Sequence, residues 1–189
     1  MDPNGFNTYR NGEFIMAKSD TISLETVETD VGGVTGATKI VGGVANNWNN
    51  KVEPSLITEK DRAYATNIKK YDVNYITFDF YLGSGANFRL YGPSAVQNGS
   101  KGFIVNTGAK LSYGNNSDIL IFDGNKPVVE LTANKWYTAS VSYAHFDREN
   151  WDYSKVFACT EITVPVGDIY LNNLRYWHED AFEVNPGFV

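Results

Sequence analysis

Apolar and polar residues alternate with a period of two through much of this chain. The clearest stretch is residues 75–82, in which every even-numbered residue is apolar and every odd-numbered residue is polar or tyrosine. An extended strand with this pattern buries one face in a core and leaves the other face amphipathic. No comparable stretch has the period of an amphipathic helix, and residues 58–65 favour a helical turn or two. The pattern predicts an all-β protein.

Turn sequences separate many further strand candidates. Besides residues 75–82, we expect strands at residues 22–27, 38–44, 64–68, 88–91, 102–106, 109–113, 119–122, 128–131, 136–143, 155–162 and 168–177. The Gly-rich turn at residues 83–87 predicts a hairpin between the strands that flank it. Short strands at regular spacing indicate a β-sandwich of jelly-roll type, built from two antiparallel sheets.

The last expected strand changes its apolar face partway along. Ile169 and Leu171 share one parity, whereas Leu174 has the other. A shift of one residue moves every following side chain to the opposite face. An extra residue at Asn172 and Asn173 would restore the apolar face, so we expect a β-bulge there.

Length and composition restrict the classes of function. A chain of 189 residues fits one domain, residues 1–189, with its core at about residues 13–178 and ends that are interpreted as cuts from a longer chain. A net charge of −6 argues against binding nucleic acid or an anionic membrane surface, and no apolar run could span a bilayer. One cysteine, Cys159, and two histidines cannot form an intrachain disulfide or a Cys/His zinc cluster. Cys159 lies in an apolar run and is interpreted as a buried thiol.

Sequence patterns typical of catalysis are missing. The Gly-rich residues 32–43 lack the ending of a phosphate-binding loop, and no Gly-x-Ser-x-Gly elbow is present. His145 and His178 are interpreted as ordinary surface or half-buried histidines. Glycoside hydrolases need two facing carboxylates. The nearest acidic cluster, at residues 25–30, is interpreted as a solvated strand end, with a calcium site or a catalytic pair as the alternatives. We expect no enzyme activity, with a small jelly-roll glycoside hydrolase or polysaccharide lyase as the alternative.

Aromatic residues in polar loops are the more informative feature. Trp48 lies between two pairs of asparagines, and Trp151 and Tyr153 lie in a similarly charged segment. Aromatic rings stack on the apolar face of a sugar, while amide and charged groups bond its hydroxyls. Trp48, Trp151 and Tyr153 are therefore predicted to stack on a saccharide, or alternatively to close an end of the sandwich.

A second candidate site lies on the polar face of the expected hairpin. Asp79 and Tyr81 come from its first strand, and Arg89 and Tyr91 from its second. Asp79 and Arg89 could pair with each other or bind a ligand. Trp136 opens a strand whose inward set begins at Tyr137, so it faces outward or caps the core. Trp136 and Trp177 are interpreted as packing residues.

Three segments carry a family resemblance. Residues 75–82 (YITFDFYL), 134–143 (NKWYTASVSY) and 168–177 (DIYLNNLRYW) resemble the β-jelly-roll carbohydrate-binding modules of secreted bacterial polysaccharide-degrading enzymes. The last segment is similar to the closing Ile-Tyr-Ile-Asp-Asn-Val-Arg strand of such modules. The middle one also resembles the Lys-Trp-Tyr strand of laminin-G and legume-lectin-like sandwiches.

The resemblance implies an extracellular, monomeric module that binds a plant cell-wall or similar polysaccharide without catalysing a reaction on it. It also implies a glycoside hydrolase module in the parent chain, in some cases within a cellulosome. A glycan-binding adhesin domain is a further alternative. No cofactor is required, although the family often holds one structural calcium ion. The matching position of its Asp ligand is Asn172, whose neutral amide would bind calcium more weakly.

Overall fold

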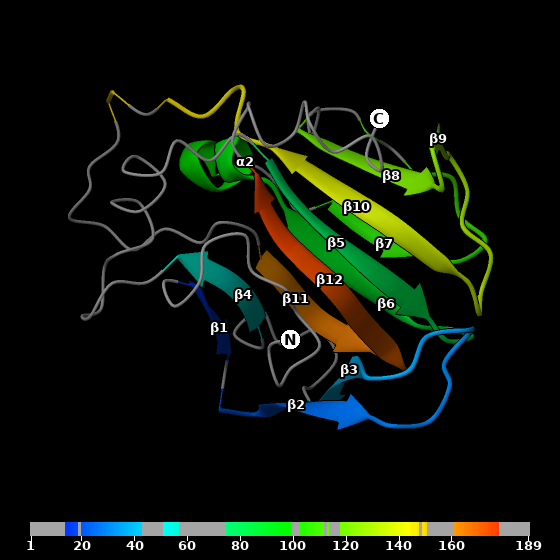
Figure 1. The fold of residues 1–189 in the computed structure, drawn as a ribbon. Coiled ribbons are helices and arrows are strands. Elements are labelled where there is room, and N and C mark those ends of the chain that lie inside the picture. Colours follow the sequence, from blue (N-terminus) through cyan, green and yellow to red (C-terminus); the bar gives the residue numbers. More distant parts are fainter. Residues whose placement is uncertain are drawn as a thin grey trace.

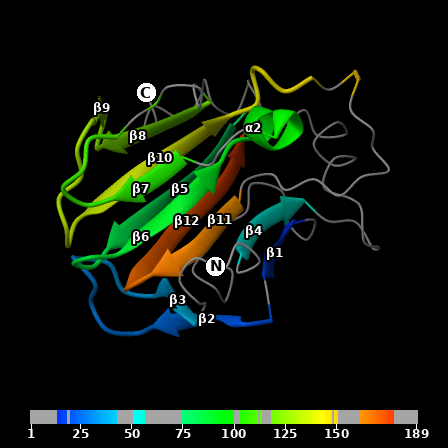
Figure 2. The same cartoon turned by 180° about the vertical axis from the view of Figure 1, so that it is seen from behind.

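The computed structural model describes residues 14–18, 20–42, 51–56, 75–99, 103–111, 113, 118–147, 149–150 and 161–177. Within these ranges the chain forms twelve strands and one short helix, α2 (Pro93–Asn98). The strands form two antiparallel sheets that face each other, as seen from the front and the back in Figures 1 and 2. The predicted all-β sandwich is confirmed.

The two sheets differ in size. The five-stranded sheet has the order β1 (Phe14–Lys18), β4 (Lys51–Leu56), β11 (Glu161–Val166), β6 (Asn87–Tyr91) and β7 (Phe103–Asn106). The seven-stranded sheet has the order β2 (Ile22–Val27), β3 (Ala37–Gly42), β12 (Ile169–Trp177), β5 (Tyr75–Leu82), β10 (Trp136–Ser142), β8 (Ile119–Asp123) and β9 (Lys126–Pro127). The chain crosses repeatedly from one sheet to the other, as in a jelly roll.

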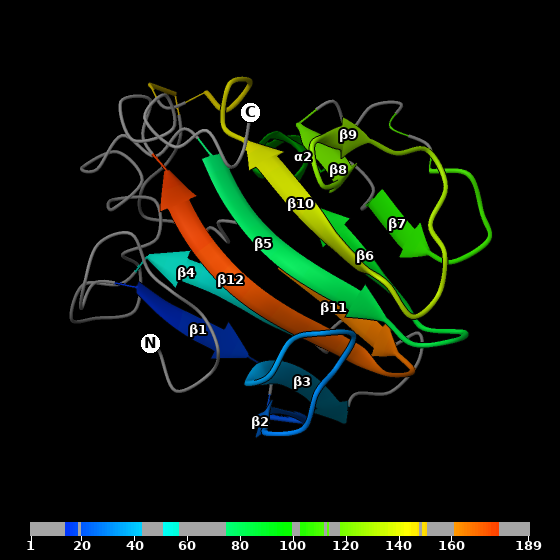
Figure 3. The ribbon, with the colours of Figure 1, turned by 45° about the vertical axis from the view of Figure 1, so that its right-hand side comes forward.

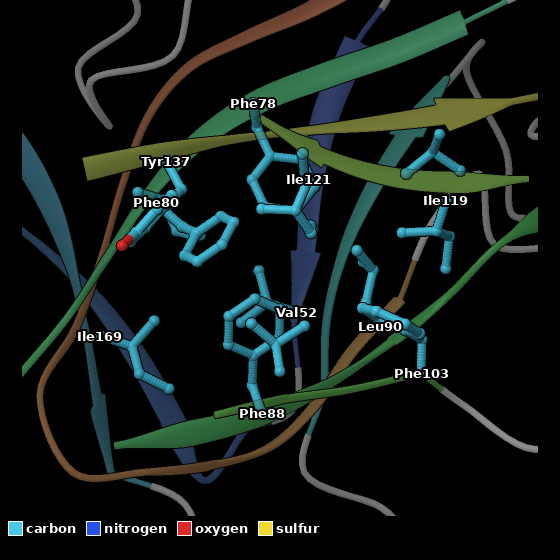
Figure 4. Close-up of a cluster of buried hydrophobic side chains, with 14 of the residues drawn as sticks. Val52, Phe78, Phe80, Phe88, Leu90, Phe103, Ile119, Ile121, Tyr137 and Ile169 are labelled. Atoms are coloured by element: carbon cyan, nitrogen blue, oxygen red, sulfur yellow. The ribbon is translucent and has the colours of Figure 1, made fainter. Parts of the chain in front are cut away.

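The core lies between the sheets, where the apolar parity of each strand points. Phe80 is 0% exposed, and its ring centre lies 5.4 Å from that of Phe88 and 5.9 Å from that of Tyr137. Figure 4 shows side chains of both sheets meeting here. Burying one such side chain stabilises the fold by about 1.5–3 kcal/mol. The alternation in β5 and β6 is thus explained by a shared core.

The predicted hairpin between β5 and β6 is wrong. β5 pairs with β10 and β12, whereas β6 pairs with β7 and β11 in the other sheet. The turn after β5 is fixed by the N–H of Gly83, which donates to the carbonyl of Asp168 (2.8 Å), and the chain then crosses the sandwich. Alternation indicates which face of a strand is buried, but two strands in opposite sheets bury their faces against each other equally well.

The predicted β-bulge in β12 is confirmed. The pairing of β12 with β5 shifts register between Asn172 and Arg175, and Asn173 has a φ of 50°. As a result Leu171 and Leu174 are both buried, at 0% and 2% exposure. The extra residue restores the apolar face on which the sequence argument depended.

Other expected elements vary in outcome. Residues 22–27 form β2 with the predicted bounds, whereas the described residues of 109–113 and 128–131 form an isolated bridge between Lys110 and Glu130 in place of the two expected strands. β1 and β4 were not anticipated; β4 contains Pro54, which argues against a strand. The strand expected at 64–68, the helical turns at 58–65 and Cys159 lie outside the described residues.

Thr38 offers a test of the core. It is 0% exposed opposite Leu171, and its hydroxyl has no hydrogen-bond partner in the described part of the chain. Since an unbonded buried hydroxyl costs about 1–3 kcal/mol, Thr38→Val should raise the unfolding temperature by about 2–4 °C, equivalent to about 1 kcal/mol. Thermal unfolding followed by circular dichroism measures this shift; a fall in Tm would contradict it.

Candidate functional site

Three aromatic residues lie side by side on the outer face of the seven-stranded sheet. Tyr170 of β12 and Trp136 of β10 are both directly opposite Tyr81 of β5 in the strand registers. The ring centre of Tyr81 lies 5.5 Å from that of Trp136 and 5.8 Å from that of Tyr170. All three are half-buried. We call Tyr170, Tyr81 and Trp136 the aromatic row; Figure 3 shows its three strands from this face.

A polar row lies beside the aromatic row, one pleat further along the same strands. It consists of Asn172, Asp79 and Thr138, which are opposite one another in register. The hydroxyl of Thr138 donates to Oδ1 of Asp79 (2.6 Å), and the side-chain amide of Asn173 donates to Oδ2 (2.8 Å). The carboxylate is therefore held from both neighbouring strands.

Charges of both signs surround the two rows. Nζ of Lys39 lies 5.6 Å from the ring centre of Tyr170 and forms an ion pair with Asp168 (2.9 Å). The hydrogen bond with Asp168 raises the pKa of Lys39. Arg175, which is half-buried on β12, adds a second cation. The face has no single dominant sign, which suits an uncharged ligand.

The loop between β2 and β3, residues 28–36, packs against two of the three rings of the aromatic row, Tyr81 and Trp136. Val31 and Val34 bond each other through N–H···O contacts of 2.8 and 3.2 Å, and the indole N–H of Trp136 donates to the carbonyl of Val31 (2.7 Å). Gly32 has a φ of +57°, and a Cβ there would lie 2.8 Å from Cε2 of Tyr81. The loop thus packs its backbone on the rings.

Gly32→Ala should lower Tm more than Gly33→Ala. Both glycines have a positive φ, but a Cβ at Gly33 would meet nothing within 4 Å. The left-handed backbone costs either variant about 1–2 kcal/mol. Overpacking against Tyr81 and Trp136 adds about 1–3 kcal/mol at Gly32. Thermal unfolding of the pair measures the difference, and equal shifts would contradict the packing of this loop on the aromatic row.

The structure separates the second set of predicted site residues. Asp79 and Tyr81 lie on the outer face of the seven-stranded sheet, in the two rows. Arg89 and Tyr91 lie on the outer face of the five-stranded sheet, because Phe88 and Leu90, which alternate with them along β6, point into the core. The four residues therefore do not form one surface, since the hairpin that would join them does not exist.

The loop aromatics remain predictions. Trp48, Trp151 and Tyr153 lie outside the described residues. Among the described residues before Trp151, Asp147 accepts hydrogen bonds from the backbone N–H of Asn150 (3.1 Å) and from its side-chain amide (2.8 Å). These bonds with Asn150 lower the pKa of Asp147.

Sequence reasoning missed Tyr170, Trp136 and Asn173 as site residues. Tyr170 has the parity opposite to its buried neighbours Ile169 and Leu171, which places it on an outer face. That signal was available in the sequence, as it was for Trp136. The strand register that brings both rings to Tyr81 could not be read from the sequence, because it is set by contacts between distant segments.

A buried carboxylate joins a serine and a histidine elsewhere in the fold. Asp118 is 3% exposed and accepts hydrogen bonds from the Ser94 hydroxyl and from Nδ1 of His145 (2.6 Å). In a catalytic triad the histidine lies between serine and aspartate, whereas here both contact the aspartate. The cluster links α2 to the loop after β10. The histidine is 64% exposed, in line with its interpretation as a surface residue.

Neither a metal-binding cluster nor a membrane-spanning helix occurs among the described residues. They contain no group of three or more His, Cys, Asp or Glu that could hold a metal ion. Among these residues, no helix has the length and apolar character needed to cross a membrane.

Comparison with known proteins finds two distantly similar structures and no similar sequence. No family model and no curated protein sequence matches this chain. A lysine-to-alanine mutant of a family 29 carbohydrate-binding module aligns over 86% of this chain and 80% of its own, with 12% identity and a TM-score of 0.37. An aspartate-to-alanine mutant of that module aligns over 85% and 87%, with 11% identity and a TM-score of 0.29. Both TM-scores are low, so neither likeness bears on the function of this chain.

Proposed function

We propose that this chain is a carbohydrate-binding module that binds a polysaccharide on the outer face of the seven-stranded sheet, without catalysing its cleavage. The observation that carries the proposal is the aromatic row beside the polar row. Half-buried rings of Tyr170, Tyr81 and Trp136 offer apolar surface to the C–H faces of sugars. The carboxylate of Asp79 and the amide of Asn172 offer hydrogen-bonding groups to hydroxyls within reach of the same ligand.

The rigidity of this face also favours binding. The rings contact one another, and the indole of Trp136 is fixed by its bond to Val31. Ordering a side chain at an interface costs about 0.5–1.5 kcal/mol. Side chains already held in place avoid much of that cost, which raises affinity.

Within the two rows, the arrangement of carboxylates favours binding over hydrolysis. Hydrolysis by a retaining or inverting glycosidase uses two carboxylates, one as acid and one as nucleophile or base. Asp79 is the single carboxylate of the rows, and both its oxygens accept hydrogen bonds from the protein. A lone carboxylate in this setting serves as a hydrogen-bond acceptor for the ligand.

The module would act in the context of a longer, secreted chain. We propose that it holds an attached glycoside hydrolase at its substrate, which raises the local enzyme concentration without a new contact to the catalytic site. It would act as a monomer and without a required cofactor. A calcium ion at Asn172 would have to compete with the hydrogen bonds that Asp79 already accepts in the polar row.

Affinity electrophoresis of the unmodified chain tests the proposal. In gels that contain xylan, glucan, mannan or pectin, we expect at least one polysaccharide to retard the protein, with and without EDTA. Parallel incubations should release no reducing ends. Retardation by none of the four would contradict polysaccharide binding, and reducing-end release would favour the hydrolase or lyase. Binding confined to glycoproteins on a glycan array would indicate an adhesin instead.

A further inference from the structure

Asp79 has hydrogen-bonding capacity left over. An ionised carboxylate offers about four lone-pair positions. Thr138 occupies one position on Oδ1, and Asn173 occupies one on Oδ2. One position on each oxygen therefore remains for other donors. Asp79 is half-buried on the outer face, between the strands that carry the two donors, so these positions are available to a donor lying on the sheet.

Asn173 reaches Asp79 because of the β-bulge. In the ladder Asn172 is directly opposite Asp79, and Asn173 is the first residue after the register is lost. Its φ of 50° lies in the left-handed region, which Asn adopts more readily than most residues. The bulge thus adds a second amide beside one carboxylate. The two consecutive asparagines have different positions, one in the ladder and one beyond it.

We propose that Asn173 is a positioning residue that orients Asp79, and that Asp79 selects a neutral sugar by accepting hydrogen bonds from two of its adjacent hydroxyls. This inference rests on the proposed function and names its ligand class. A carboxylate held by two donors presents one acceptor position per oxygen, which matches a pair of neighbouring hydroxyls. A glycan that carries its own carboxylates brings like charge to Asp79 and is disfavoured.

The test compares charged and neutral derivatives of one polysaccharide. The polysaccharide of the four-gel panel that retards the unmodified chain most is converted to a carboxymethyl and a hydroxyethyl derivative of equal substitution. The unmodified chain should bind the hydroxyethyl form about tenfold more tightly. Asp79→Asn should bind that form about tenfold more weakly, as expected when a hydrogen bond to a charged group is lost. It should also bind the two derivatives with affinities within about twofold of each other, because the repelling charge is gone.

Asn173→Gly removes the amide and tolerates the left-handed backbone. It should weaken binding of the hydroxyethyl form about three- to tenfold, since one positioning hydrogen bond is lost. Asn134→Gly is the matched control: Asn134 also has a positive φ, 61°, and its amide contacts Ser84 rather than Asp79. It should bind as the unmodified chain does, with a Tm similar to that of Asn173→Gly.

The outcomes separate the two proposals. If the unmodified chain is retarded, any of three results overturns the inference. The unmodified chain could bind the two derivatives equally, Asp79→Asn could retain a preference for the hydroxyethyl form, or Asn173→Gly could bind like the unmodified chain. If no polysaccharide of the panel retards the unmodified chain, the proposed function is contradicted, and this inference falls with it.

Discussion

Phe80→Ala is expected to lower Tm by about 10 °C. Phe80 is 0% exposed at the centre of the core, where its ring meets Phe78 and Tyr137 of its own sheet and Phe88 of the other. Truncating a buried phenylalanine costs about 3–5 kcal/mol, because apolar contact is lost and a cavity remains. In a chain of this size each kcal/mol shifts Tm by about 2–4 °C. Thermal unfolding by circular dichroism or calorimetry measures the change.

Leu120→Ala is the control for that experiment. Leu120 lies on β8 of the same sheet, but it faces outward and is 42% exposed. An exposed substitution of this kind changes stability by about 0.5 kcal/mol or less. If Leu120→Ala lowered Tm as much as Phe80→Ala, the assignment of inward and outward faces in this sheet would be wrong.

Tyr81→Ala is expected to weaken polysaccharide binding roughly 30-fold. Tyr81 is the middle ring of the aromatic row and contacts both other members. Its removal takes away its own stacking surface and the support of Trp136 and Tyr170. Central aromatic residues of an interface contribute about 2 kcal/mol or more, which corresponds to this factor. Affinity electrophoresis against the polysaccharide that retards the unmodified chain measures the loss.

Tyr91→Ala is the matched control, because it removes the same side chain from the opposite sheet. Tyr91 is also half-buried on an outer face, next to Glu161 of β11 in register. If the ligand lies on the seven-stranded sheet, Tyr91→Ala should bind as the unmodified chain does. Loss of binding in Tyr91→Ala with retention in Tyr81→Ala would move the site to the five-stranded sheet.

The sequence predicts which face of a strand is buried better than it predicts which strands pair with each other. Alternation identified the buried apolar residues of β5, although Thr77, which has the outward parity, is buried as well. The change of parity located the bulge at Asn172 and Asn173, because the two-residue period of a strand is a local property. The hairpin of β5 and β6 was wrong because the turn that follows β5 is compatible with pairing or with crossing the sandwich. β4 was not predicted because it contains Pro54, and a proline within a segment argues against a strand.

The same limit applies to the site. Asp79 and Tyr81 could be assigned to an outer face from their parity, and the structure places both in the two rows. Arg89 has outward parity too, but on the other sheet. Tyr170 and Trp136 could each be recognised as outward, yet their contact with Tyr81 depends on the register of β12 and β10 with β5. That register is decided by the whole core.

The positions of β11 and β12 have a consequence for the order in which this fold can form during synthesis. β11 is the only described link between β4 and β6, and β12 is the only described link between β3 and β5. Both strands come last among the described elements. A nascent chain that ends before Glu161 therefore holds four separate groups of strands with unpaired edges, and such edges invite association with other chains. Consolidation of both sheets must wait for the last two strands, and pairings between such distant segments form slowly.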